Sequence, residues 1–233
     1  MPADLHLFSS PGETDPGDIQ WIVEAARPYL ERKAGARLAY LPLASLNGER
    51  TVEETEKAFR GLAQVETINT ETMDLPGMEA LLRRAALAYI PGGNTFLLNH
   101  RLHLRQLFSY LRKKLEAGLP LVAFSAGALL CGPNILTSND INMVPTEHFD
   151  SLSLTPFNFV AHYADDPWND YRLHDYQAFH DNPLLLLEDG AYVRVRGRET
   201  ILVRGPAWLW RVGRDKERLE PGAKISPLEA QHG

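Results

Sequence analysis

The sequence predicts an α/β protein built on a mostly parallel sheet flanked by helices, and three features lead to this prediction. In the first half, short apolar runs alternate with segments whose apolar residues recur at helical spacing, which is typical of parallel strands joined by helices. Two loops rich in small residues follow apolar runs, after residues 90 and 124, at the strand ends where such sheets place their sites. In the last third, glycine-containing turns separate short apolar runs, which favours an antiparallel C-terminal edge.

The elements of the first half follow from apolar spacing and from turn residues. Residues 5–8 form the first expected strand. The helix over residues 19–30 should be kinked or trimmed by Pro28. A longer helix, expected around residues 104–115 with its apolar residues on one face, ends near Gly118. The remaining expected elements are strands at residues 37–43, 65–69, 87–90 and 121–124, and helices at residues 52–62 and 78–84.

The last third is expected to hold four short strands that form a meander at one sheet edge. Gly190, directly after Asp189, indicates a tight hairpin turn between two of them. The four strands are expected at residues 184–188, 192–195, 200–203 and 208–212. No linker, repeat or low-complexity tract divides the chain, so residues 1–233 are expected to form one domain.

Composition excludes several classes of protein. The net charge of −6 lacks the basic footprint of a nucleic-acid-binding protein. No stretch approaches the roughly 18 apolar residues of a membrane span, and the N-terminal residues do not look like a signal peptide. The single cysteine, Cys131, allows no intrachain disulfide, which suits a reducing compartment. We therefore expect a cytoplasmic protein that binds neither nucleic acid nor membrane.

The run Phe124-Ser125-Ala126-Gly127 stands between an apolar strand and an expected helix. A nucleophile elbow needs this sharp turn and small neighbours, because strand and helix approach closely there. The Ala126 N–H would then face a developing oxyanion near a helix N-terminus. Taken alone, the run fits equally well an ordinary helix whose N-cap is Ser125.

The run Pro91–Thr95 also follows an apolar strand, and its glycines allow backbone N–H groups to face an oxyanion. Taken alone, a plain turn with Asn94 or Thr95 as helix cap explains it better. The run lacks the lysine of a phosphate-binding loop and the glycine spacing of a dinucleotide fingerprint.

A serine nucleophile needs a base, and the base needs an orienting carboxylate. His162 is the best base, because it ends the apolar run that starts at Phe157. Asp140 and Glu188 are both candidates for the carboxylate, and spacing does not choose between them.

Two further candidates, a histidine pair and a cysteine, are less suited to catalysis or metal binding. His100 and His103 could form half of a zinc site, but no third ligand is evident. Cys131, six residues past Ser125, is expected to be a packed and inert thiol.

Several ordered segments together resemble peptidase E, the aspartyl dipeptidase family of serine peptidases. The resemblance covers nearly the whole chain and is most specific over residues 87–163. The matching segments are Ile90–Phe96, Phe124–Ala128, Gly132-Pro133, Thr137–Asp140, Ala161–Tyr163, Glu188–Gly190 and Pro227–Ala230. The resemblance implies a fold like that of class I glutamine amidotransferases.

The resemblance also implies residue roles. Ser125 would be the nucleophile, His162 the general base and acid, and Asp140 the third member, with Glu188 as the alternative. Gly93 and Ala126 would donate N–H groups to the oxyanion. Apart from these roles, a substrate carboxylate needs a fixed cation or several donors, and Arg172, the first arginine after His162, is expected to contact it with the help of Asn94. No metal or cofactor is implied, and a homodimer is expected.

Three departures from the family pattern bear on these roles. Pro91 stands where the family usually has the first of three glycines, which removes one N–H. Val160-Ala161 stands where the family has Asn-Pro before the histidine. Trp168–Asp175 stands where the family has a Gly-Glu-Thr-Arg segment linked to substrate recognition, so a preference broader than N-terminal aspartate is the alternative.

The expected function is hydrolysis of small peptides, dipeptides with N-terminal aspartate in particular, through an acyl-enzyme. Two alternatives stay open at this point. One is a related hydrolase acting on a β-aspartyl or cyanophycin-like bond. The other is a non-catalytic binding module on the same fold, since fold does not determine function.

Overall fold

The protein is described by a computed structural model, which covers residues 3–12, 19–46 and 48–227. Within these ranges, seven strands form the larger sheet in the order β3-β2-β4-β5-β1-β8-β9. Strands β1 to β5 run parallel, and β8 and β9 add antiparallel to the edge at β1. The strands are β1 (Asp4–Phe8), β2 (Arg37–Tyr40), β3 (Gln64–Thr67), β4 (Leu87–Ile90), β5 (Leu121–Phe124), β8 (Tyr192–Arg196) and β9 (Glu199–Arg204).

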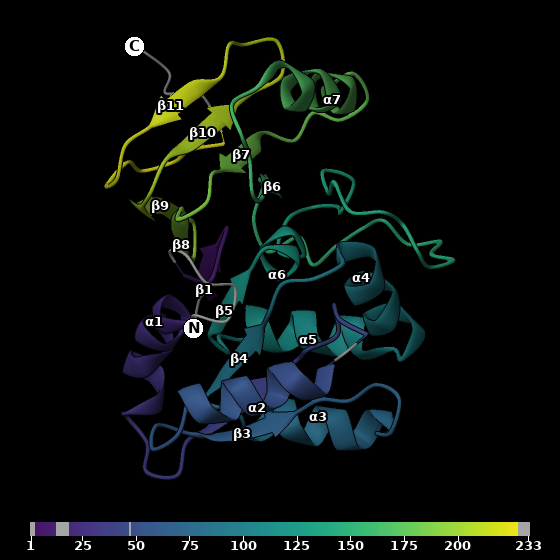
Figure 1. Ribbon diagram of the computed structural model, residues 1–233, viewed down its shortest axis with the longest axis vertical. Helices are drawn as coiled ribbons and strands as arrows, with labels where there is room; N and C mark the ends of the chain where they lie inside the picture. Colours follow the sequence, from purple (N-terminus) through teal and green to yellow (C-terminus); the bar gives the residue numbers. More distant parts are fainter. Residues whose placement is uncertain (1–2, 13–18, 47, 228–233) are drawn as a thin grey trace.

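Helices cover both faces of this sheet (Figure 1). Helices α1 (Gln20–Leu30) and α2 (Gly48–Ala58) lie on one face, where Ile22 and Tyr89 share a buried cluster. The other face packs a cluster that includes Leu111. Its helices are α3 (Leu75–Arg84), α4 (Thr95–Leu104), α5 (Leu107–Glu116) and α6 (Ala126–Leu129). Central strand β4 is buried at every position, as a parallel strand between two helical layers must be.

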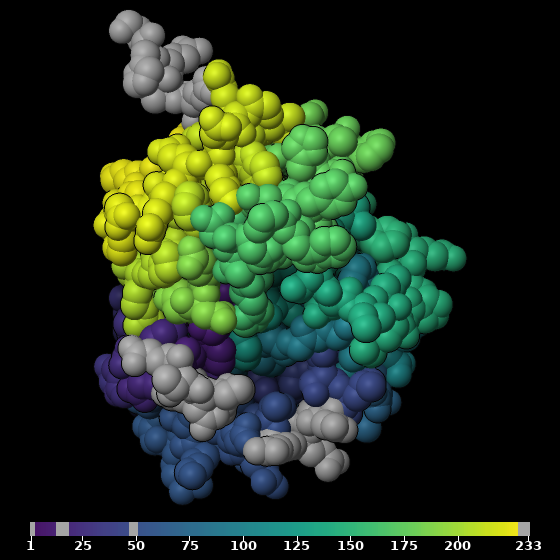
Figure 2. Space-filling model, turned by 45° about the horizontal axis from the view of Figure 1, so that its top comes forward, coloured from purple at the N-terminus to yellow at the C-terminus, as the bar shows by residue number. Residues whose placement is uncertain are grey.

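A second sheet lies beyond the carboxyl end of β5. In the described part of the chain its strand order is β11-β10-β7-β6, and helix α7 (Pro167–Gln177) packs on it through Leu173 and Tyr176. The strands are β6 (Asn158–Val160), β7 (Leu184–Leu187), β10 (Ala207–Trp210) and β11 (Glu217–Leu219). The space-filling view shows this green and yellow part packed directly on the rest of the molecule (Figure 2).

The expected mostly parallel sheet with flanking helices and an antiparallel edge is confirmed, but the meander is wrong in detail. Only β8 and β9 lie at the edge of the larger sheet, whereas β7 and β10 pair with each other in the second sheet. Residues 184–187 are leucine at every position and are wholly buried. Such a strand needs cover on both faces of its sheet: Leu185 and Leu187 pack into the main core, and Leu184 and Leu186 pack against α7.

Two helices also differ from expectation. The longer helix around residues 104–115 is divided into α4 and α5, because Gln106 has a φ of 57° and so cannot continue a right-handed helix. Residues 168–175, for which no helix was expected from sequence, belong to helix α7. The Asp166 carboxylate caps this helix by accepting from the N–H groups of Trp168 and Asn169, and Pro167 occupies its first position. An acidic cap followed by proline was the available sequence sign of this helix.

Candidate active site

Ser125 stands at a strained turn between β5 and α6. Its backbone has φ 49° and ψ −117°, a conformation that costs energy for any residue with a Cβ. The Ser125 N–H donates to the Phe8 carbonyl at 3.0 Å, which ties the turn to neighbouring strand β1. At Gly127, an added Cβ would lie 2.4 Å from the Ile90 carbonyl oxygen. The close approach of α6 to β4 therefore requires glycine there, as an elbow does.

His162 reaches Ser125 from the second sheet. It follows β6, and its Nε2 atom lies 3.0 Å from the Ser125 hydroxyl oxygen. Its Nδ1 atom lies 2.6 Å from Oδ1 of Asp189. If Nδ1–H donates to this carboxylate, Nε2 is left as the acceptor for the serine proton. The three side chains thus form one hydrogen-bonded row.

The carboxylate in this row is neither of the two expected from sequence. Asp140 accepts instead from the Thr95 N–H at 2.7 Å and from the Ser138 hydroxyl at 2.9 Å. Glu188 accepts from the indole N–H of Trp208 at 2.9 Å. The structure therefore places Asp189, one residue past Glu188, where both expectations had put another acid.

Sequence reasoning had placed Asp189 at an expected turn and in the family-like segment Glu188–Gly190, but gave it no catalytic role. The turn leads from β7 of the second sheet into β8 of the larger one. Its place within two residues of the end of buried strand β7 was the one local sign of a role, and Glu188 shares that place.

The glycine loop after β4 packs directly on the serine turn. An added Cβ at Gly92 would lie 2.5 Å from the Phe124 ring and 3.0 Å from Cβ of Ser125. Gly93 has a φ of 132°, which side chains rarely allow, and its Cβ would meet the Ala44 carbonyl. Pro91 has no N–H, and the N–H of Asn94 donates to Ala44. The loop donors left for a ligand are therefore those of Gly92 and Gly93.

Ala126 contributes a further backbone donor. As the first residue of α6, it has an N–H with no acceptor inside the helix. The helix N-terminus adds a partial positive charge at the same place. Ala126 and the glycine loop thus flank the Ser125 hydroxyl with groups that stabilise negative charge.

The two expected substrate contacts are both bonded to the segment 137–141. Asn94 accepts from the Leu97 N–H as the cap of α4 and donates to the Ile141 carbonyl at 2.8 Å. Arg172, on α7, donates to the Thr137 carbonyl at 2.9 Å. Burial lowers the pKa of Arg172. Among the described residues 3–12, 19–46 and 48–227, the ion pairs include none between a carboxylate and the Arg172 guanidinium.

The remaining candidates lie outside the row. His103 stacks between the rings of Phe108 and His148, and no group of three metal-binding side chains occurs among the described residues. Cys131 is wholly buried, and burial raises the pKa of its thiol. Within the same ranges, no helix is long and apolar enough to span a membrane.

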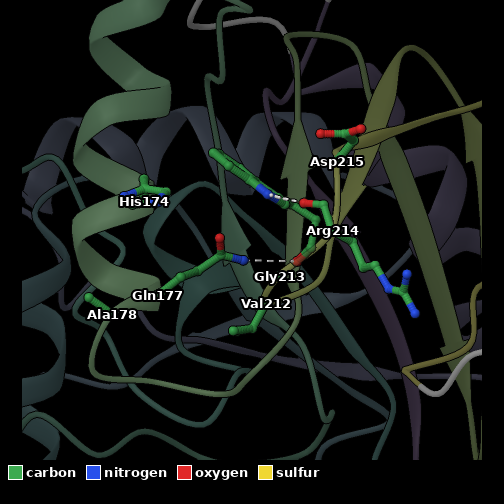
Figure 3. Close-up of a pocket in the computed structure, with 8 residues that line it drawn as sticks. His174, Gln177, Ala178, Val212, Gly213, Arg214 and Asp215 are labelled. Atoms are coloured by element: carbon green, nitrogen blue, oxygen red, sulfur yellow. Dashed lines mark hydrogen bonds between the residues drawn. The ribbon is translucent and has the colours of Figure 1, made fainter.

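A surface pocket of about 540 Å³ lies between α7 and residues 210–215 (Figure 3). His174, Gln177 and Asp215 are among its lining residues, and no member of the serine–histidine–aspartate row is. The reactive groups instead lie in the open, since the His162 side chain is 45% exposed and that of Asp189 is 69% exposed. The pocket is therefore separate from the serine–histidine–aspartate row.

A serine hydroxyl, an imidazole and a carboxylate in one row, beside backbone donors at the end of a parallel sheet, are typical of a serine hydrolase. Comparison with known proteins gives the family. Residues 5–203 match the model of Peptidase family S51. The chain belongs to this family of peptidases and is a hydrolase.

Relatives agree along most of the chain. A Streptomyces coelicolor protein named "Peptidase E" is 29% identical over 240 residues, which cover 97% of this chain and 94% of the relative. A Drosophila melanogaster protein described as "Probable alpha-aspartyl dipeptidase" is 35% identical over 66% of this chain and 68% of its own length. The solved structure of a peptidase from an acI-B1 Actinobacterium has a TM-score of 0.73 at 18% identity and covers 97% of both chains. That structural likeness shows that the two chains share a fold.

Proposed function

We propose that this peptidase hydrolyses dipeptides with an N-terminal aspartate through an acyl-enzyme on Ser125. The observation that carries the proposal is the row in which His162 lies 3.0 Å from Ser125 and 2.6 Å from Asp189. The names of the relatives, peptidase E and alpha-aspartyl dipeptidase, support the substrate class. The whole chain, residues 1–233, acts as one domain in this proposal.

The chemistry follows from the geometry. The Ser125 oxygen attacks the peptide carbonyl while Nε2 of His162 takes the hydroxyl proton. The Asp189 carboxylate stabilises the imidazolium that forms. The N–H groups of Gly93 and Ala126, with Gly92 beside them, hold the oxyanion of the tetrahedral intermediate.

The second half of the reaction uses the same groups. His162 returns its proton to the leaving amine, which departs as the C-terminal product and leaves an ester on Ser125. A water molecule then attacks the ester and gives a proton to His162. The ester C–O bond breaks, and that proton returns to the serine oxygen, so the enzyme ends the cycle unchanged.

Arg172 is the proposed partner of the substrate's aspartate side chain, with Asn94 beside it. A carboxylate that loses its water on binding needs a fixed cation or several donors. The guanidinium has five N–H groups, and Nη1 contacts Thr137, so donors remain for a ligand. Because helix α7 replaces the recognition segment typical of the family, activity on a different amide, such as a β-aspartyl bond, is the second candidate.

The test is hydrolysis of a dipeptide panel varied at the first residue, with a fluorophosphonate probe for the reactive serine. Preferred cleavage of Asp-Leu and labelling of Ser125 support the proposal. Cleavage of β-aspartyl substrates alone favours the second candidate. Absence of both hydrolysis and labelling rejects a catalytic role.

We also propose that the protein is a cytoplasmic homodimer. The Trp168 side chain on α7 is 74% exposed, and burial of an aromatic ring of this size stabilises an interface. Light scattering at micromolar concentration tests the dimer, and a monomer mass would contradict it. Cell fractionation tests the location.

A further inference from the structure

The members of the proposed triad belong to different sheets. Ser125 follows β5 of the larger sheet, and His162 follows β6 of the second. Asp189 lies in the connection from β7 to β8, which passes from one sheet to the other. The distance from Ser125 to His162 therefore depends on how the two sheets are held together at this point.

The residues just after β1 hold them together. The hydroxyl of Ser9 accepts from the His162 N–H at 2.8 Å and donates to the Leu187 carbonyl at 3.0 Å. The Ser9 N–H donates to the Ala191 carbonyl at 3.0 Å. The side chain of Ser9 thus bonds to the main chain just after β6 and at the end of β7, and its backbone N–H bonds to the turn that holds Asp189.

Ser10 extends this contact to the carboxylate. Its hydroxyl accepts from the Gly190 N–H at 3.0 Å and donates to the Gly12 carbonyl at 3.3 Å. Together with the bond from the Ser125 N–H to the Phe8 carbonyl, residues 8–10 bond to the main chain at Ser125 and His162 and directly after Asp189.

These bonds are of the kind that fixes a position. Ser9 is wholly buried, so the loss of its hydroxyl would remove the acceptor of the His162 N–H, whereas the Leu187 carbonyl would keep its bond from the Tyr163 N–H. His162 has a φ of 54°, which is strained and persists only where surrounding contacts impose it. The bond from its N–H to Ser9 is such a contact.

We propose that Ser9 and Ser10 are positioning residues of the catalytic triad: Ser9 sets the place of His162 relative to Ser125, and Ser10 sets the turn that presents Asp189. The proposal rests on the proposed serine hydrolase mechanism. Both hydroxyls bond to main-chain groups and not to the triad side chains. A misplacement of about 1 Å in the reacting groups is enough to cost about 100-fold in rate.

The test compares Ser9→Ala with Ser151→Ala. Ser151 is also a buried serine whose hydroxyl donates to a carbonyl, that of Gly132, and it is not bonded to any triad residue. We expect Ser9→Ala to lower kcat per titrated active site about 10- to 100-fold with KM within about twofold. Ser151→Ala should keep kcat while losing similar thermal stability. Ser10→Ala should lower kcat about 3- to 10-fold.

Loss of stability without loss of kcat in Ser9→Ala, or equal kcat losses in Ser9→Ala and Ser151→Ala, would overturn the proposal. If Ser9→Ala does not fold, Ser10→Ala decides: a fall in kcat supports the proposal, and an unchanged kcat overturns it. The rate of fluorophosphonate labelling at Ser125 is measured in every variant. If wild type is labelled but cleaves no dipeptide of the panel, the substrate proposal fails, and the labelling rates still test the positioning role.

Discussion

The Nδ1 atom of His162 lies 2.6 Å from Oδ1 of Asp189, and the neighbouring acid, Glu188, bonds instead to Trp208. Of these two adjacent acids in one turn, only Asp189 is thus hydrogen-bonded to His162.

Asp189→Asn should lower kcat by about 100-fold or more, because an amide favours the wrong imidazole tautomer and does not stabilise an imidazolium. Glu188→Gln is the matched control, one residue away, and should stay within about threefold of wild type. Steady-state kinetics on Asp-Leu make the comparison. A larger loss in Glu188→Gln than in Asp189→Asn would reverse the assignment.

Ser125→Ala should abolish hydrolysis while the fold is kept. Removal of a triad nucleophile costs about 10⁴-fold or more in rate, and the change deletes one partly exposed hydroxyl. Turnover of the purified variant and its circular dichroism spectrum are the measurements. Near-normal turnover by a well-folded variant would remove Ser125 from the mechanism.

Gly92→Ala should impair catalysis, because the new Cβ would lie 2.5 Å from the Phe124 ring and 3.0 Å from Cβ of Ser125. Relief of that clash moves the oxyanion loop away from the nucleophile, and we expect kcat to fall at least about 10-fold. Gly35→Ala is the control: it is strained by a φ of 67° but has open space around it. The control should lose stability and keep kcat, and equal kcat values in both variants would contradict the prediction.

Arg172→Ala should separate substrates by charge. We expect kcat/KM for Asp-Leu to fall about 100-fold, as for loss of a charged hydrogen bond, and that for Ala-Leu to stay within about threefold. Kinetics on both substrates are the measurement. Equal losses on the two would instead mean that Arg172 acts through its bond to Thr137, and no loss on either would leave it without a role in specificity.

His6 should make stability depend on pH. Burial, and then the nearby Arg194, lower the pKa of this histidine to about 4, although Asp4 acts in the opposite direction. The unfolded chain takes up the proton near pH 6.5 and the folded chain does so only near pH 4. The free energy of unfolding is therefore highest above about pH 6.5 and should fall by up to about 3 kcal/mol as the pH drops to about 4.

The measurement is urea unfolding of wild type and His6→Gln at pH 7 and at pH 4.5. Both proteins lose stability in acid as carboxylates titrate, so the difference between them isolates His6. A loss in His6→Gln as large as that of wild type would show that His6 does not contribute.

The local sequence pattern was enough to predict those elements and residues whose positions depend on their neighbours in the chain. The apolar runs at residues 87–90 and 121–124 form β4 and β5 as expected, because alternating short apolar runs and helical spacing reflect burial directly. The elbow around Ser125 was visible from its small residues, and His162 from its place after an apolar run. In the structure, Nε2 of His162 lies within hydrogen-bond distance of the Ser125 hydroxyl.

Non-local contacts decided the rest. Whether Glu188 or Asp189 faces His162 depends on how a turn leaves β7 for the other sheet, and Asp140 was excluded only by its bonds to Thr95 and Ser138. The division of the four C-terminal strands between two sheets likewise depends on which distant segments cover the leucines of β7. Sequence spacing specifies which residues share a face of one element, whereas the direction of a turn and the pairing of strands far apart in the chain arise from packing between elements.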